Sequence, residues 1–298
     1  MKRFLVLITV ACMMLGMTAY ADFADVKAGD DGYEAIAVLN ALGILKGFDE
    51  GYFGSSFETT RAEFCAFIVR MVGMPDSAIA VIDTDFSDVT ADHWASGYIM
   101  AANMAGIVNG YGNGNFGPNK ELTYEQAMKM LVCTLGYAPK AEASGGYPTG
   151  YMLVANQVGI TKGTKHFTGP IERLTMAKLL YNSLTVPLME QTSFGSVDGP
   201  EYKIIESSSV QYVKLGVIMT EAKLISFKDK AAEFEYISFD DVAALNGWTT
   251  EEDGEFTLPA EISVENADLT GLVGKTLNVY LNISDAEKPE FIRASIVE

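Results

Sequence analysis

The strongest constraint on this chain is a sequence pattern that occurs three times between Asp22 and about Leu188. The third copy is looser than the others: its Gly159 follows Gly106 by 53 residues, whereas Arg173 follows Tyr124 by only 49. Because a repeat defines the folding unit, the fold has to be built from three related pieces. The first two copies lie 63 residues apart without a gap and share these landmarks: Phe23/Phe86, Asp25/Asp88, Val26/Val89, Ile36/Ile99, Gly43/Gly106, Ile44/Ile107, Gly47/Gly110, Phe53/Phe116, Thr60/Thr123 and Gly73/Gly136.

Each copy has the pattern of two helices joined by a loop. A pair of helices cannot bury an apolar stripe alone, so we expect the three copies, residues 22–85, 86–140 and 141–188, to pack into one all-α bundle. A glycine follows the first helix of each copy and is expected to end it in the left-handed conformation, at Gly43, Gly106 and Gly159. The second helices carry their stripes at helical spacing: Phe64, Phe67, Ile68 and Met71; Ala127, Met130, Leu131 and Leu135; Met176, Leu179, Leu180 and Leu184.

The composition changes after Leu188. Segments that mix β-branched and aromatic residues with alternating polarity are separated by turns rich in Gly or Asp, which predicts a small all-β domain, a barrel or a sandwich, over residues 189–298. The chain as a whole is therefore predicted to be a multidomain α+β protein. A short helix is expected near residues 240–245. The expected strands are residues 210–218, 224–227, 233–239, 277–283 and 291–297.

Residues 1–21 have the pattern of a secretory signal peptide. Lys2 and Arg3 precede an apolar run, and Ala19 and Ala21 form the small-x-small pair of a cleavage site. We expect export with cleavage after Ala21, and no membrane span afterwards, because no later apolar stretch reaches about 18 residues. Lipidation of Cys12 is an alternative, although the residue at position 9 is Thr where such a site needs a branched aliphatic residue.

The charge and the reactive residues argue against several classes of protein. The chain has 39 Asp and Glu against 21 Lys and Arg, a net charge of −18, so nucleic acid is excluded as a partner. Cys65 and Cys133 are expected to be buried free thiols. No metal-ligand spacing, no cofactor motif and no catalytic constellation is recognisable, so we expect neither a cofactor nor an enzyme.

The starts of the second helices carry both caps and arginines. Thr60 with Glu63, and Thr123 with Gln126, have capping-box spacing. Arg61 lies in the first helical turn, where a cation opposes the helix dipole, so capping does not explain it. Arg173 occupies the same place in the third copy although the cap there has decayed, which favours ligand binding over local stability; a solvated or ion-paired arginine is the alternative.

Together these motifs resemble the S-layer homology domain. The residues that carry the resemblance are FADV and FSDV, HWASGYI, GILKG and GIVNG, NGYGNGNFGP and TTRAEF. The resemblance implies non-covalent attachment to bacterial cell-wall polysaccharide, often a secondary polymer with pyruvyl ketals, in grooves between neighbouring repeats. It also implies a secreted protein located in the cell wall or S-layer.

Five residues are then candidate ligand contacts. A guanidinium of Arg61 or Arg173 pairs bidentately with a ketal carboxylate. Tyr124 replaces the arginine in the second copy, so that site is expected to be weak, silent or a platform for a neutral sugar. Trp94 and its counterpart Tyr147 are either stacking platforms for a pyranose or buried core aromatics.

Two functions remain. The first is a non-enzymatic wall anchor in which the β domain is a spacer or a module for self-association in an envelope layer. The alternative is an anchored enzyme that acts on glycans, with its site in the C-terminal domain. We favour the anchor, because a glycosidase needs two carboxylates about 5 to 10 Å apart across a cleft, which a domain this small rarely provides.

Overall fold

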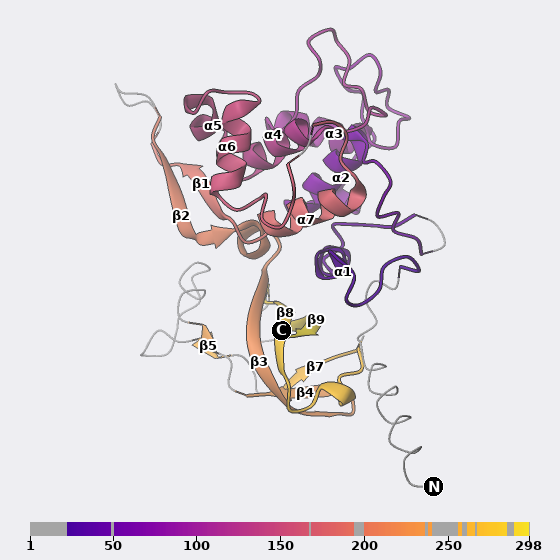
Figure 1. Ribbon diagram of the computed structural model, residues 1–298, viewed down its shortest axis with the longest axis vertical. Coiled ribbons are helices and arrows are strands. Elements are labelled where there is room, and N and C mark those ends of the chain that lie inside the picture. Colours follow the sequence, from indigo (N-terminus) through magenta and orange to yellow (C-terminus); the bar gives the residue numbers. More distant parts are fainter. Residues whose placement is uncertain are drawn as a thin grey trace. The chain divides into compact units, whose positions relative to one another are not determined.

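A computed structural model describes residues 23–48, 51–166, 168–193, 200–235, 238–239, 256–257, 261–265, 267–284 and 289–297. The expected signal peptide and the helix expected near residues 240–245 lie outside these ranges. The chain has α+β structure and divides into two compact units, of which one spans residues 22–215 and the other contains residues 216–298 (Figure 1). No helix in the described part of the chain is long and apolar enough to cross a membrane.

The first unit contains the helices of the three copies. Each copy has the two expected helices, and the third has an additional short helix, α5, before its first helix, which the sequence pattern did not predict. The helices are α1 (Tyr33–Ala41), α2 (Arg61–Met71), α3 (Ser96–Met104), α4 (Tyr124–Thr134), α5 (Ala138–Ala143), α6 (Thr149–Gln157) and α7 (Arg173–Ser183).

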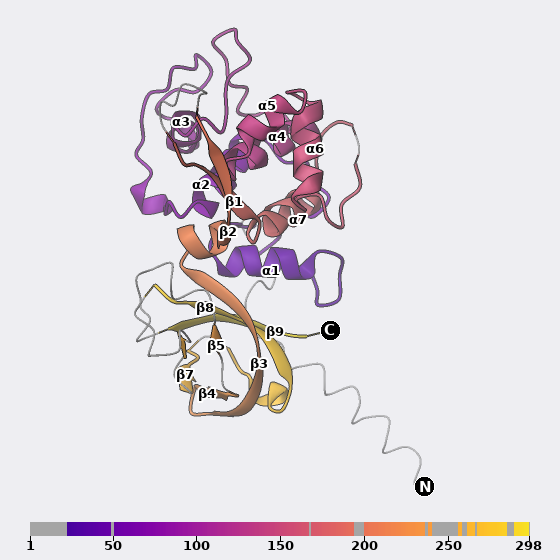
Figure 2. The same ribbon diagram turned by 90° about the vertical axis from the view of Figure 1, so that its left-hand side faces the viewer.

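The copies interlock, because the first helix of each copy packs against the second helix of another. Helix α3 packs on α2, α6 packs on α4, and α1 closes the circle by packing on α7 (Figure 2). The second helices also touch at the centre, where α4 contacts both α2 and α7. Most residues of the predicted stripes are less than 5% exposed. A copy therefore buries its apolar surface against its neighbours and not within itself.

A cyclic set of backbone hydrogen bonds joins the three extended segments that precede α2, α4 and α7. The Thr59 N–H donates to Ile171 O at 2.9 Å, the Ile171 N–H donates to Leu122 O at 2.9 Å, and the Leu122 N–H donates to Thr59 O at 2.8 Å. All three residues are fully buried. Removing any one copy leaves a backbone donor and an acceptor unpaired in the other two, which is costly in a buried site.

Two of the sequence landmarks have clear structural roles. Asp25 accepts hydrogen bonds from the backbone N–H groups of Phe53 and Gly54 at 2.7 and 2.8 Å, and Asp88 makes the equivalent pair in the second copy. These carboxylates tie the start of a copy to its own loop. The prediction for the glycines that end the first helices is also confirmed, since Gly43, Gly106 and Gly159 have φ values of 70°, 71° and 89°.

The helical unit extends beyond the expected boundary at residue 188. Strands β1 (Pro187–Gln191) and β2 (Tyr202–Ser209) form an antiparallel hairpin, and a π-helical turn (Val210–Lys214) follows. The Met189 N–H donates to Leu135 O at 3.0 Å, and the Tyr137 hydroxyl donates to Pro187 O at 2.8 Å, so the hairpin is fastened to the end of α4. The strand expected over residues 210–218 is wrong for its first half, which is this π-helical turn.

Close backbone approaches hold the same extension against two helix ends. A Cβ atom added to Gly136 would lie 1.9 Å from Met189 O, and one added to Gly73 would lie 2.4 Å from Lys214 O. Both glycines also have positive φ values, 85° and 83°. Only glycine fits at these two repeat positions, which explains why they are among the shared landmarks.

The second unit is built on a five-stranded antiparallel sheet in the order β7-β4-β3-β8-β9. The edge strands β7 and β9 also contact each other, so the sheet curls towards a barrel. The expected strands at 224–227, 277–283 and 291–297 correspond to β3, β8 and β9, whereas the one expected over 233–239 is divided between β4 and β5. The strands are β3 (Val217–Lys228), β4 (Ala231–Phe234), β5 (Ser238–Phe239), β6 (Phe256–Thr257), β7 (Glu261–Ser263), β8 (Thr276–Asn282) and β9 (Glu290–Ile296).

Candidate functional site

Arg61 lies in a buried position between two copies and is only 6% exposed. Its guanidinium donates from Nε to Phe116 O at 3.0 Å, from Nη2 to Asn109 O at 3.1 Å and from Nη1 to Gln126 Oε1 at 3.3 Å. The same group lies over the rings of Tyr111 and Phe116 at 4.8 and 4.5 Å. The first copy thus inserts this arginine into the loop of the second copy.

Arg173 makes the equivalent connection from the third copy to the first and is 2% exposed. Its guanidinium donates to Phe53 O and Lys46 O, both at 2.8 Å, and pairs with Glu63 Oε1 at 3.1 Å. Burial lowers the pKa of Arg173, and the negative charge of Glu63 opposes this effect. The side chain lies over the Phe48 and Phe53 rings at 4.6 and 4.9 Å.

The two arginines therefore do not stand at exposed helix starts with free N–H groups beside them, as pairing with an external ketal carboxylate would require. The Arg61 and Ala62 N–H groups donate to Lys120 O and Pro118 O at 2.9 and 3.0 Å, and the Arg173 N–H donates to Phe57 O at 2.8 Å. Carbonyls from another copy therefore already satisfy these helix N-termini. The sequence pattern did not reveal this, because every partner is at least 48 residues away or in another repeat.

Tyr124 occupies the corresponding place at the start of α4 and is 2% exposed. Its ring meets His166 edge-on at 5.4 Å between centroids, and its N–H donates to Gly169 O at 3.0 Å. At this junction an aromatic ring in contact with His166 stands where the other two copies have a guanidinium. A residue this deeply buried offers little ring surface to a sugar.

The caps are formed at two of the three helix starts. Thr60 accepts from the Glu63 N–H at 3.2 Å while the Glu63 carboxylate accepts from the Thr60 N–H at 2.8 Å, which confirms this capping box. Thr123 accepts from the Gln126 N–H at 3.3 Å. The Gln126 side chain, however, pairs with Arg61 and with the Tyr111 hydroxyl instead of reaching back to the cap.

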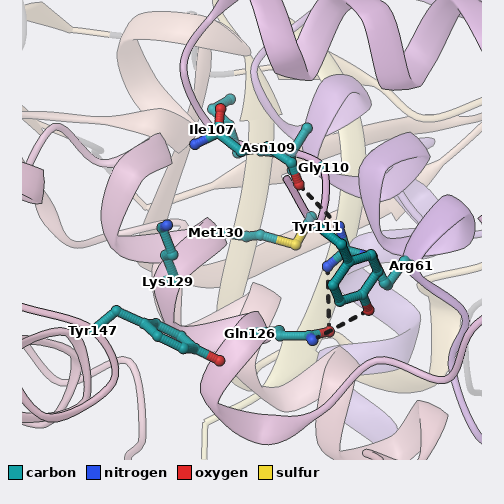
Figure 3. Close-up of a pocket in the computed structure, with 10 residues that line it drawn as sticks. Arg61, Ile107, Asn109, Gly110, Tyr111, Gln126, Lys129, Met130 and Tyr147 are labelled. Atoms are coloured by element: carbon teal, nitrogen blue, oxygen red, sulfur yellow. Dashed lines mark hydrogen bonds between the residues drawn. The ribbon is translucent and has the colours of Figure 1, made fainter. Parts of the chain in front are cut away.

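A pocket of about 170 Å³ lies where all three copies meet (Figure 3). Arg61, Gln126 and Tyr111 are joined by hydrogen bonds on one side of it, with Lys129 and Tyr147 on the other. The pocket thus brings together Arg61 and Tyr147 from the predicted set, whereas Arg173, Tyr124 and Trp94 are not among its lining residues. The lining consists of Arg61, Ile107, Val108, Asn109, Gly110, Tyr111, Gln126, Lys129, Met130 and Tyr147.

Lys129 is a charged lining residue of the pocket that the sequence analysis did not single out. Its Nζ lies 5.5 Å from the centre of the Tyr147 ring and 5.7 Å from that of Tyr151. Within the described part of the chain its ammonium makes no hydrogen bond or ion pair, so it is available to an anion. The sequence signal was a lysine among the apolar residues Met128, Met130 and Leu131, but the tyrosines beside it come from the third copy.

The two aromatic candidates are exposed and not buried in the core. Tyr147 is 49% exposed and borders the pocket. Trp94 is 56% exposed and stacks on His93, with 6.0 Å between ring centres. The 63-residue offset makes Ala66 of α2 the counterpart of Lys129. Helix α2, on which α3 packs, therefore carries no cation at this position.

Similarity to known proteins agrees with the repeat pattern. Residues 22–65 and 85–128 match the model of the S-layer homology domain. The chain is 31% identical over 245 residues to a cell surface protein of Thermoanaerobacter kivui, and the matched region covers 76% of this chain and 32% of that protein. It is 35% identical over 159 residues to a surface layer protein of Brevibacillus choshinensis, covering 53% of this chain and 14% of that protein.

An enzyme also shares part of the sequence. An endoglucanase of Bacillus sp. (strain KSM-635) is 34% identical over 115 residues, which is 39% of this chain and 12% of the enzyme. The chain spans about a third or less of the length of these relatives. The chain therefore carries S-layer homology domains in residues 22–65 and 85–128, and its location is the cell surface or cell wall.

Proposed function

We propose that residues 22–215 anchor this protein non-covalently to an anionic, pyruvylated polysaccharide of the bacterial cell wall, as part of an S-layer or envelope protein. The three copies act as one unit, because each buries its helices against the others. The observation that carries the proposal is the pocket in which the available ammonium of Lys129 lies 5.5 Å from the centre of the half-exposed Tyr147 ring.

The pocket offers the chemistry that an acidic sugar needs. Lys129 supplies a charge-assisted hydrogen bond to a carboxylate, and the Tyr147 ring supplies an apolar face for a pyranose. Gln126 adds a polar side chain. Because the volume is below the ~300 Å³ at which pockets for drug-sized molecules begin, it suits one substituted sugar ring.

Arg61 has a supporting part in this proposal. Its hydrogen bonds hold Asn109 and Gln126 in the pocket wall, and its ring contacts hold Tyr111. Its positive charge also raises the local potential next to Lys129, in a protein whose net charge of −18 otherwise repels a polyanion. Arg173 and Tyr124 are then scaffold residues, and the exposed Trp94 is a candidate stacking surface without a counterpart of Lys129 on α2.

Cosedimentation of the full-length protein with purified walls tests the proposal. Binding is expected to disappear when the non-peptidoglycan polymer is removed from the walls. Lys129→Ala is expected to weaken binding by about tenfold or more, because a hydrogen bond to a charged group contributes about 1.5 to 3 kcal/mol. Lys203→Ala, which removes an exposed lysine of β2, is the matched control and should bind normally.

Unchanged binding by Lys129→Ala would reject this pocket as the site, and retention on stripped walls would reject the polymer as the ligand. We propose that residues 216–298 serve as a spacer or as a module for self-association. The alternative of an anchored glycan-cleaving enzyme predicts that the full-length protein releases soluble sugars from the walls during the same incubation, whereas the anchor releases none.

A further inference from the structure

The lysine of the pocket has a counterpart one copy later. Lys129 and Lys178 are each the sixth residue of an 11-residue helix, α4 and α7 respectively. Each of these helices is covered by a first helix from the next copy around the circle, α6 on α4 and α1 on α7. The two lysines therefore occupy equivalent positions in the repeat, which generates two potential anion receptors.

The residues that face these lysines differ. The repeat offsets of 53 and 63 residues make Tyr147, Trp94 and Asp31 equivalent. Lys129 accordingly lies beside the Tyr147 ring, whereas Lys178 Nζ pairs with Asp31 Oδ1 at 2.5 Å. The Lys178 side chain is 20% exposed and that of Asp31 is 77% exposed, so the carboxylate lies on the solvent side of the ammonium.

The neighbouring backbone favours this pair. A Cβ atom added to Gly32 would lie 3.2 Å from Lys178 Cε and 2.4 Å from a methyl carbon of Leu174, so the chain next to Asp31 runs directly against α7. This close approach places the carboxylate over Lys178. Two further positions of the Lys129 pocket differ in the Lys178 groove: Tyr124 stands in the place of Arg61, and Thr175 stands in the place of Gln126.

We propose that the Asp31 carboxylate pairs with Lys178 in the same way as a ligand carboxylate pairs with Lys129. Asp31 thereby prevents ligand binding in the groove between the third and first copies. The inference rests on the proposed function and deepens it: the ligand class is a carboxylate-bearing sugar, and the chain binds it in a single groove. Since α2 has Ala66 at the equivalent position, the remaining groove lacks this receptor.

Replacing the carboxylate tests this inference by a gain of binding. Titration calorimetry of the full-length protein with a methyl glycoside that carries a pyruvyl ketal should give one binding site. Asp31→Tyr, which removes the carboxylate and restores the aromatic residue of the working pocket, should give two. Adding Lys178→Ala to Asp31→Tyr should return the number to one, and the methyl ester of the probe, which has no charge, should bind at least about tenfold more weakly at each site.

Asp31→Asn provides a second variant with a smaller change of shape, and it should add a weaker second site. Thermal melting of each variant checks that it is folded, which we expect because the Asp31 side chain is exposed. The inference is rejected if Asp31→Tyr and Asp31→Asn both keep one site, or if the unmodified protein already has two. If the unmodified protein binds nothing, or if Lys129→Ala keeps its site, the proposed function fails, and the role of Asp31 fails with it.

Discussion

Replacing Arg173 by alanine should destabilise the helical unit strongly, although the residue lies in the first turn of a helix. The guanidinium is the hydrogen-bond donor for the buried carbonyls of Phe53 and Lys46 and the partner of the Glu63 carboxylate. Its removal leaves two carbonyls without a donor at a site where the side chain is 2% exposed. Deleting one member of a buried, hydrogen-bonded ion pair costs about 3 to 5 kcal/mol.

Glu63 is 22% exposed and regains water when its partner is lost, so the lower half of that range is the better expectation, about 3 to 4 kcal/mol. A unit of this size loses about 2 to 4 °C in melting temperature for each kcal/mol. Arg173→Ala should therefore lower the melting temperature by about 6 to 16 °C. Arg173→Lys should fall in between, because an ammonium cannot donate to three separated acceptors in the planar geometry of a guanidinium.

Differential scanning calorimetry of the full-length protein measures this effect, with Lys165→Ala as the exposed control. Urea titration followed by circular dichroism gives the free energy of unfolding directly. A melting temperature within about 2 °C of the unmodified protein would refute the reasoning. It would mean that water replaces the guanidinium, and that the arginine is retained for ligand binding, as the helix-dipole argument from the sequence suggests.

Asp76 accepts hydrogen bonds from Arg70, Lys46 and Tyr98, and chiefly the Arg70 bond lowers the pKa of its carboxyl below the ordinary value of 3.8. A folded-state pKa below the unfolded-state pKa stabilises the folded protein at pH values above the unfolded-state pKa, and this stabilisation is lost as the pH falls through the folded-state pKa. Asp76→Asn should therefore lower the free energy of unfolding by about 1 kcal/mol or less at pH 7 and by progressively less below about pH 4, as measured by urea denaturation. Gly136→Ala should lower the melting temperature more than Gly112→Ala, because both glycines have positive φ but only at Gly136 does the new Cβ meet a backbone oxygen; equal losses would contradict the close approach. A protein consisting of residues 22–215 should unfold in one sharp thermal transition, and one ending at residue 188 should melt at lower temperature because the hairpin contacts are lost. A protein ending near residue 136 should show no cooperative transition, and a sharp transition from it would disprove the interdependence of the copies.

Features that depend on short stretches of chain were predictable from the sequence. The apolar stripe of α2, the capping box of Thr60 and Glu63 and the left-handed glycine after each first helix all involve residues within about one or two helical turns of one another. Their energetics are local, so the pattern of residue types was sufficient. The same holds for the strands β8 and β9, in which alternation of polarity reports the two faces of the sheet.

The partners of the arginines, the end of the helical unit and the receptor lysine were decided only by the tertiary structure. Arg61 and Arg173 look superfluous in their own helices, because the carbonyls that they satisfy belong to other copies. The hairpin of β1 and β2 joins the helical unit although its sequence is typical of the β domain, because Gly136 lets its backbone approach the end of α4. Lys129 and Lys178 are indistinguishable in a helical pattern; a tyrosine beside one and a carboxylate over the other differentiate them. Each of these contacts joins segments from different copies, or a helix end and the later hairpin, so no pattern of neighbouring residues in the chain reports its energy.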